Sequence, residues 1–392
     1  MDSARTRSPE PPNDLRYMID ASNLSSNIHV LADIPNSSNC LSVAVSPDGK
    51  AYAVSLANGM VNAYLARNEK LIYTCNKREK NHSCSATSLR FRPWGKGDVN
   101  PNNLILATFT NGKVKTFHYP SGECVHQFNE HRELLTCEYS QVGDTFATSG
   151  NDGVLNVYDD ETRAKLISYS PPFYENARFR RIYSIAYHTQ SVDELVTGGW
   201  DGVVRYYDLR ISHMIKQFYG PYICGEGLAI DPTGRELCTA SWRMKDSLQL
   251  WDYGSGQLIK NISIPTSRSL EEYESSGRRG KRRSMSIMSL PRISSSISSP
   301  SRTSFTQNMD SVNLLQLPHM LYCCRYFLSG DFIVFSGSNH NSVAVINKYS
   351  NEIVAAVSGL RNSVYCIGAY GPKLAVISGE HVGLVKAFLN YA

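Results

Sequence analysis

The chain has 392 residues, of which 42% are hydrophobic and 19% are charged, and its formal net charge is +5. This composition is typical of a soluble globular protein, and no apolar stretch is long enough for a transmembrane helix. The N-terminal residues are polar and proline-rich, without the apolar core of a secretory signal, so we expect a cytoplasmic or nuclear protein.

The ten cysteines include no Cys-x-x-Cys pair and lie mostly in apolar runs. Zinc sites and redox pairs need closely spaced cysteines, so we expect buried, reduced thiols. The sequence also lacks a phosphate-binding loop and a dinucleotide-binding fingerprint. We therefore expect neither a metal nor a cofactor.

In chain order, residues 1–23 predict a flexible tail, and the remainder carries an internal repeat. Each repeat runs from a turn residue through alternating apolar residues, in most copies to an aromatic one. Its seven copies are residues 57–66, 110–119, 151–160, 200–209, 244–253, 339–348 and 380–389, with the turn residue at 58, 111, 152, 201, 245, 340 and 382. A period of this length indicates a solenoid, a propeller or an array.

The third repeat shows four short strands with period-two alternation, at residues 134–140, 144–150, 154–160 and 164–170. Four antiparallel strands in each of seven repeats are typical of a propeller. The sequence therefore predicts an all-β fold, a seven-bladed β-propeller of four-stranded antiparallel blades that spans residues 24–392.

Several repeats carry a further motif: Trp251-Asp252 in the fifth, Tyr207-Asp208 in the fourth, Tyr158-Asp159 in the third, and Glu130-His131 before the third. With these motifs the chain resembles the WD-repeat β-propeller family. The resemblance implies a structural hydrogen-bond network with these members: His131, Thr148, Asp152, Tyr158, Thr197, Asp201, Tyr207, Trp251 and Asp252. It also implies that Ile28–Ile34 pairs with the last repeat and closes the ring.

Residues 266–318 interrupt the propeller between the fifth and sixth repeats. Eight basic and four acidic side chains lie between residues 266 and 311, among many serines, which predicts a disordered insertion. Ser284 and Ser286 follow basic residues and are candidate phosphorylation sites, and the basic run 278–283 could serve nuclear import. An insertion without a function remains a third alternative.

Two apparent chemical sites have a structural explanation. His131, Thr148 and Asp152 could form a hydrolase triad, but the propeller network explains their spacing, and the chain has no nucleophile elbow. The run 149–160 lacks the alternating carboxylates of a calcium loop. We expect no catalytic residue, no metal ligand and no enzyme activity.

Two short motifs suggest particular partners. The segment Tyr207–Arg210 resembles the aromatic-Asp-x-Arg box by which some propellers dock on the adaptor of cullin-4-type ubiquitin ligases, and Arg210 would make the contact. Phe179-Arg180-Arg181 resembles the paired arginines of phosphoinositide-binding propellers, although Ile182 stands where those proteins have glycine.

These observations favour a non-enzymatic scaffold or adaptor that binds other proteins in a complex. The alternatives are a substrate receptor of a cullin-RING ubiquitin ligase and a phosphoinositide-binding propeller. The excess positive charge lies in the insertion, so neither nucleic acid nor membrane is strongly indicated. The candidate partner-binding residues are Trp94, Arg180, Arg181, Trp200, Arg210, Trp242 and Arg243.

Overall fold

The structure is a computed structural model of the chain. It describes residues 28–76, 84–94, 103–170, 180–264, 317–338, 341–358, 360, 362–370 and 373–387. All of them belong to one compact unit, residues 1–264 and 316–392. In this described part, the strands form seven antiparallel sheets of four strands each, and no helix is present.

The first four sheets follow one another along the chain, and each is formed by consecutive strands. Sheet 1 contains β2 (Cys40–Val45), β3 (Ala51–Leu56), β4 (Val61–Leu65) and β5 (Leu71–Cys75). Sheet 2 contains β6 (Ala86–Phe91), β7 (Leu104–Phe109), β8 (Lys113–His118) and β9 (Glu123–Asn129). Sheet 3 contains β10 (Leu134–Tyr139), β11 (Thr145–Gly150), β12 (Leu155–Asp159) and β13 (Lys165–Tyr169). Sheet 4 contains β14 (Ile182–Tyr187), β15 (Glu194–Gly199), β16 (Val203–Asp208) and β17 (Met214–Tyr219).

The last three sheets include the two ends of the described chain. Sheet 5 contains β18 (Leu228–Ile230), β19 (Glu236–Ala240), β20 (Leu248–Asp252) and β21 (Leu258–Ile262). Sheet 6 contains β22 (His319–Phe327), β23 (Phe332–Ser338), β24 (Val343–Asn347) and β25 (Ile353–Val357). Sheet 7 contains β26 (Val364–Tyr370), β27 (Lys373–Ser378), β28 (His381–Ala387) and β1 (Ile28–Pro35).

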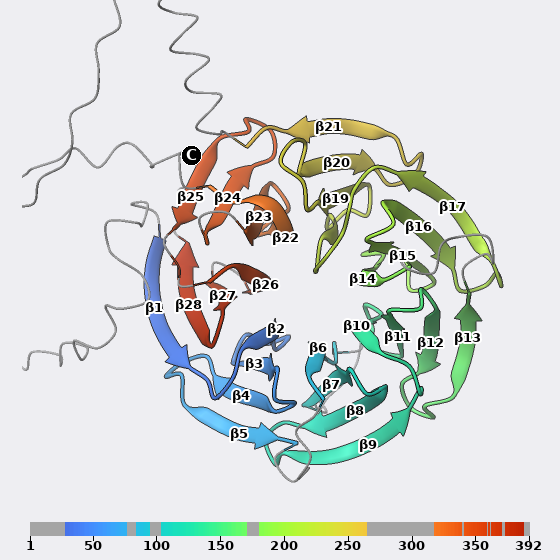
Figure 1. Cartoon of the computed structure of the whole chain (residues 1–392), viewed down its shortest axis with the longest axis vertical. Helices are drawn as coiled ribbons and strands as arrows, with labels where there is room; N and C mark the ends of the chain where they lie inside the picture. Colours follow the sequence, from blue (N-terminus) through green and yellow to red (C-terminus); the bar gives the residue numbers. More distant parts are fainter. Residues whose placement is uncertain are drawn as a thin grey trace, which may run out of the picture. The chain divides into compact units, whose positions relative to one another are not determined.

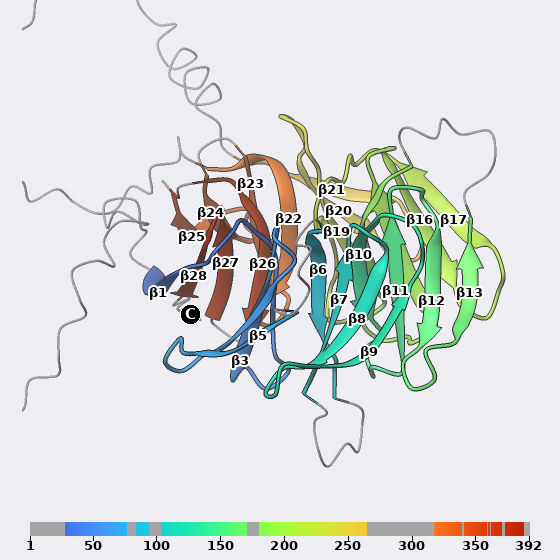
Figure 2. The same ribbon diagram turned by 60° about the horizontal axis from the view of Figure 1, so that its bottom comes forward.

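The sheets stand around a central space like the blades of a propeller (Figure 1). The first strand of each of sheets 1 to 6, and β26 of sheet 7, lies innermost, and neighbouring inner strands contact one another all the way round from β2 to β26. In the oblique view, the strands run between the two faces of the ring (Figure 2). The predicted all-β propeller of four-stranded antiparallel blades is confirmed.

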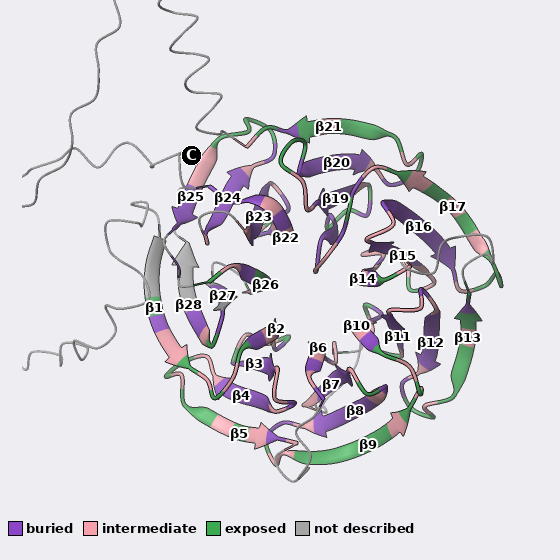
Figure 3. Ribbon diagram, in the orientation of Figure 1, coloured by how far each residue is buried: buried purple, intermediate pink, exposed green. Residues whose placement is uncertain are grey.

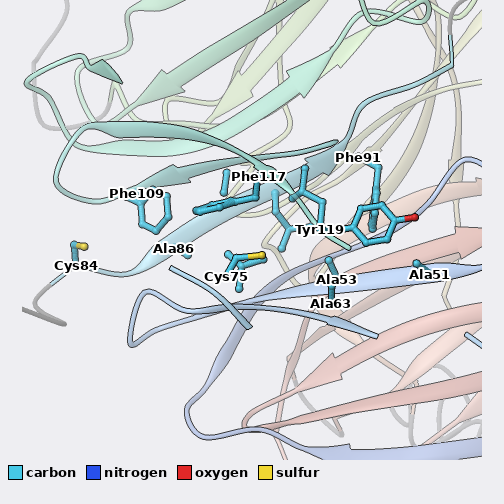
Figure 4. Packing of buried hydrophobic residues seen from close by; sticks show 14 residues of the cluster. Ala51, Ala53, Ala63, Cys75, Cys84, Ala86, Phe91, Phe109, Phe117 and Tyr119 are labelled. Carbon is cyan, nitrogen blue, oxygen red and sulfur yellow. The ribbon is translucent and has the colours of Figure 1, made fainter. Parts of the chain in front are cut away.

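Burial follows the position of each strand in its sheet (Figure 3). In sheets 1 to 6 the second and third strands are almost entirely buried, whereas the outer strand β9 is exposed along nearly its whole length. The core consists of side chains packed between neighbouring sheets. Between sheets 1 and 2, small residues such as Ala53 and Ala63 face large ones such as Phe109 and Phe117 (Figure 4). Packing of small against large side chains in this way is typical of a close-packed protein interior.

Strand β1 completes sheet 7 by pairing antiparallel with β28, from Ile28 opposite Ala387 to Pro35 opposite His381. Asp33 and His381 add a side-chain contact between the two strands, at 2.9 Å between Oδ1 and Nδ1. The predicted pairing of Ile28–Ile34 with the last repeat is confirmed. The ring is therefore closed by strands from opposite ends of the chain.

Two positions predicted from the sequence are wrong: that of the seventh turn and that of the end of the insertion. The seventh turn lies at Gly379 and Glu380, and Val382, the predicted turn residue, is buried within β28. Glycine is favoured there because Gly379 has φ +61°. Leu317 and Pro318, the predicted end of the insertion, are buried ahead of β22. Residues 1–23 and 266–316, with Ser284, Ser286 and the basic run 278–283, lie outside the described residues.

Candidate functional site

One cavity of about 210 Å³ opens at the face where the inner strands begin. Residues of the inner strands, or of the segments just before them, contribute to it from all seven sheets. Its wall includes the rings of Tyr183, Tyr322 and Tyr365, and Glu226 lies among its lining residues. The Tyr322 and Tyr365 rings are 5.1 Å apart. We call this cavity the aromatic mouth.

A cluster of larger aromatic side chains lies beside the aromatic mouth. The Trp200 ring lies 5.4 Å from that of Trp242 and 6.2 Å from that of Tyr222. The Trp242 amide donates a hydrogen bond to the Tyr222 carbonyl at 2.9 Å, which holds two of the three residues together. Tyr222 is 47% exposed and the neighbouring Met244 is 55% exposed. We call Trp200, Tyr222, Trp242 and Met244 the aromatic face; exposed apolar side chains gathered in this way are typical of a protein-binding surface.

Deeper in the ring, alternation along the inner strands brings charged side chains into the same central space. Ser88 and Thr136 line the aromatic mouth, and Arg90 and Glu138 follow each of them at a distance of two residues. Because side chains two positions apart on a strand point to the same side, Arg90 and Glu138 project below the aromatic mouth.

Four of these side chains form what we call the ion-pair network: Arg90, Glu138, Glu226 and Arg325. Arg90 Nε donates to Glu138 Oε2 at 2.7 Å, and Arg90 Nη1 donates to Glu226 Oε1 at 2.9 Å. Arg325 Nη2 contacts Glu226 Oε2, and the Ser42 hydroxyl donates to Glu226 Oε1 at 3.1 Å. The network joins sheets 2, 3 and 6 through the segment that precedes β18.

Electrostatics keep the centre of this network ionised. Burial by itself raises the pKa of Glu226, but the positive charges of Arg90 and Arg325 outweigh burial and lower that pKa to about 2. Burial likewise favours a neutral Arg90, whereas Glu138 and Glu226 raise its pKa well above the ordinary value. Glu226 and Arg90 are therefore both charged near neutral pH.

A second cavity of about 460 Å³ lies on the other side of the ion-pair network. Glu138 and Arg325 line it together with the polar side chains of Gln141 and Thr189. The inner strand β18 (Leu228–Ile230) contributes the apolar part of the cavity wall. We call this cavity the polar mouth. Because Glu226 lines one cavity and Arg325 the other, the ion-pair network lies between the two mouths.

The fifth repeat shows the tryptophan contact that its motif implies. Trp251 is buried, its Nε1 donates to Thr239 Oγ1 at 3.0 Å, and its ring stacks on Phe218 with centroids 4.2 Å apart. The family model "WD domain, G-beta repeat" matches residues 122–159, which include the Tyr158-Asp159 pair of the third repeat. The third repeat is thus similar to a WD repeat, within a chain whose fold is a β-propeller.

Three curated relatives show similarity to this propeller. "WD repeat-containing protein slp1" of Schizosaccharomyces pombe is 21% identical over 246 residues, 62% of this chain and 46% of the relative. "U3 small nucleolar RNA-associated protein 12" of Saccharomyces cerevisiae is 26% identical over 30% of this chain and 12% of its own length. "U3 small nucleolar RNA-associated protein 21 homolog" of S. pombe is 24% identical over 50% of this chain and 20% of its own. The chain thus spans less than half the length of each relative.

The predicted network of the third repeat exists with a different centre. His131 is exposed and has φ +56°, so its side chain does not enter the sheet. Glu130 takes that place and accepts hydrogen bonds from Thr148 Oγ1 and Asn156 Nδ2, both at 2.5 Å. Arg132 then joins Glu130 to Asp152, at 2.7 and 2.8 Å. The prediction for His131 is wrong, because a carboxylate can accept from the same donors.

The other predicted members of the hydrogen-bond network differ in the contacts that they make. Asp201 forms an ion pair with Arg205 at 2.6 Å, whereas the buried Thr197 Oγ1 has no hydrogen-bond partner among the described residues. Tyr158 stacks on Phe146 with centroids 5.3 Å apart. Tyr207 is buried and packs against Tyr169 at 4.6 Å, while Asp252 accepts hydrogen bonds from the Ser255 amide and hydroxyl, both at 2.7 Å.

The predicted partner-binding residues do not form one site. Trp200 and Trp242 belong to the aromatic face, but Arg243 is fixed within it by bonds to the Gly220 and Asp246 carbonyls at 3.2 and 2.8 Å. Arg243 therefore stabilises the loop, and its role as a partner contact stays a prediction. Trp94 is 44% exposed but follows the far end of β6, on the opposite face.

The remaining arginines also lie apart. Arg180 is half-buried and Arg181 is exposed just before β14, and Phe179 lies outside the described residues. Arg210 follows β16 on the face opposite to Trp200, and its side chain is 65% exposed. Two bonds from Arg210 to Asp208, at 2.8 and 2.6 Å, hold it in one pose.

In the part of the chain that the structure describes, no three His, Cys, Asp or Glu side chains lie close enough together to hold a metal ion. Nor is any helix of that part long and apolar enough to cross a membrane. The residues of the ion-pair network were not predicted from the sequence. Three of them have a local signal, a charged residue inside an inner strand, as Arg90 in β6.

Proposed function

We propose that the protein is a non-enzymatic scaffold or adaptor subunit, a closed seven-bladed platform on which other proteins dock. The observation that carries the proposal is the aromatic face, where partly exposed Tyr222 and Met244 lie beside Trp200 and Trp242. Aromatic side chains held by a rigid framework supply contact area at little cost in conformational entropy. The names of the relatives, which refer to WD repeats and to U3 small nucleolar RNA, agree with a role in multiprotein complexes.

Crosslinking and affinity capture of the tagged full-length protein test this function. Tyr222→Glu places a charge on the aromatic face and should remove most of the captured partners. Tyr349→Glu is the matched control, because Tyr349 is 68% exposed and lies in the turn between β24 and β25 on the opposite face. If both variants capture the same partners as the unaltered protein, the aromatic face is not the docking surface.

A ubiquitin-ligase substrate receptor is a second candidate, favoured by the pose of Arg210. The guanidinium is exposed but fixed by Asp208, so a partner would meet it in one orientation. Arg210→Ala should abolish capture of the ligase adaptor, and Arg210→Lys should weaken it because lysine cannot form the bidentate contact. An adaptor that is absent from the unaltered sample, or that binds the Ala variant equally, would reject this candidate.

The location of the protein in the cell and its binding of phosphoinositide remain predictions. We propose a nuclear or cytoplasmic location, and the two relatives named for U3 small nucleolar RNA favour the nucleus. Binding of phosphoinositide through Arg180 and Arg181 has the weaker support, since only Arg181 is exposed. Imaging of the full-length protein, with and without the run 278–283, tests the location.

A further inference from the structure

The ion-pair network is an open chain of alternating charges. Arg90 contacts two carboxylates and Glu226 contacts two guanidinium groups, so each inner charge has two opposite partners. Glu138 and Arg325 are the ends, and each contacts only one member of the network. Among the described residues these two ends form no ion pair with each other.

Both ends retain unused hydrogen-bonding atoms. Glu138 Oε1 accepts no hydrogen bond, and Arg325 Nε and Nη1 donate none within the described part of the chain. Their side chains are 19% and 30% exposed. Both line the polar mouth, so a negative and a positive group border the same cavity.

The polar mouth has the dimensions and lining of a small-molecule site. Its volume of about 460 Å³ falls within the range of about 300–1,000 Å³ found for ligand pockets. Gln141 and Thr189 add polar atoms, and Leu228–Ile230 adds an apolar wall. A ligand can therefore find both charged and apolar contacts there.

Charge balance selects the class of ligand. The network contains two guanidinium groups and two carboxylates, so a purely anionic or purely cationic ligand would leave an excess charge at a partly buried site. A ligand with one ammonium and one carboxylate would satisfy Glu138 and Arg325 together. We propose that the polar mouth binds a small zwitterion of the α-amino acid class, which closes the open chain of charges into a ring.

Titration calorimetry on the full-length protein tests the site with named probes. Glycine and L-leucine carry both charges, whereas acetate and methylammonium carry one each and serve as controls at equal ionic strength. Saturable binding of glycine or L-leucine, at least about tenfold tighter than that of acetate or methylammonium, is the expected result. No saturable binding of either zwitterion, or equal binding of acetate, would overturn the proposal.

Substitutions inside and outside the polar mouth test whether the zwitterion binds in this cavity. Glu138→Gln keeps the shape of the side chain but removes the negative end, and should weaken zwitterion binding at least about tenfold. Gln141→Trp narrows the cavity at an exposed position and leaves the ion pairs intact, so it tests the site even if Glu138→Gln does not fold. Tyr365→Phe in the aromatic mouth should change nothing. Binding that survives both Glu138→Gln and Gln141→Trp would reject this location.

Discussion

At the scale of single residues, Glu226 is the side chain on which the centre of the ring depends most. Replacing it by glutamine removes the negative charge that Arg90 and Arg325 share. Arg325 would lose its counter-ion and the buried Arg90 one of its two, so we expect the free energy of unfolding at pH 7 to fall by about 3 kcal/mol. Urea denaturation of the Glu226→Gln variant measures this loss.

Glu133→Gln is the matched control, since Glu133 is exposed and lies outside the network. It should change the free energy of unfolding by less than about 0.5 kcal/mol. A loss in Glu226→Gln no larger than that of the control would show that the network does not stabilise the ring.

The lowered pKa of Glu226 predicts how stability depends on pH. The ordinary value is 4.5 and the folded value is about 2, so the unfolded chain takes up the proton first. The contribution of ionised Glu226 to the free energy of unfolding is therefore complete above pH 4.5 and is lost as the pH falls towards 2. This amounts to about 3 kcal/mol by proton linkage. Urea denaturation between pH 6 and pH 2 should show a smaller decline for Glu226→Gln, and parallel curves would contradict the assignment.

The residue scale is where sequence reasoning was least complete. Near residue 131 three polar side chains follow one another, and the family pattern does not say that Glu130 and Arg132 enter the sheet while His131 points outwards. The ion-pair network was missed for another reason. Arg90, Glu138 and Glu226 are far apart in the chain, and only closure of the ring brings them together.

At the scale of strands, Gly199 at the end of β15 allows the backbone there to lie close to the backbone of Arg181. A Cβ atom at Gly199 would lie 1.9 Å from the carbonyl oxygen of Arg181, which accepts a hydrogen bond from the Trp200 amide at 3.2 Å. Gly199→Ala should therefore force the two backbones apart and cost about 2 kcal/mol or more. Thermal unfolding measures the loss.

Gly254→Ala provides the comparison for this substitution. Its Cβ would meet only Asp252 Oδ1, at 3.5 Å, an ordinary contact distance. We expect a change below about 0.5 kcal/mol there. Equal effects of the two substitutions would mean that the contact with Arg181 is not what requires glycine at position 199.

Strands were predicted better than side-chain contacts, for a physical reason. The four strands of the third repeat lie within one residue of their predicted bounds at each end, because alternation and turn residues are local signals. The seventh turn was misplaced where these signals conflict. Gly383 lies within β28 and suggests a turn, whereas the turn itself uses Gly379.

At the scale of the whole molecule, closure of the ring depends on a strand from the other end of the chain. A chain that begins at Asn36 lacks β1, so β28 would lose its antiparallel partner and His381 its contact with Asp33. Ala32, which packs with Cys40 and Val382 in the core, would also be lost. A loss of several kcal/mol should lower the midpoint of thermal unfolding by about 5 °C or more, and should expose β28 as an edge that promotes aggregation.

Two further samples separate closure from a general effect of truncation. A chain that begins at Asn23 keeps β1 and should unfold at the temperature of the full-length protein. A synthetic peptide of residues 24–38, added to the chain that begins at Asn36, should restore part of the lost stability by supplying the strand in trans. If the shorter chain unfolds at the unaltered temperature, or the peptide has no effect at millimolar concentration, pairing of β1 with β28 is not what holds the ring together.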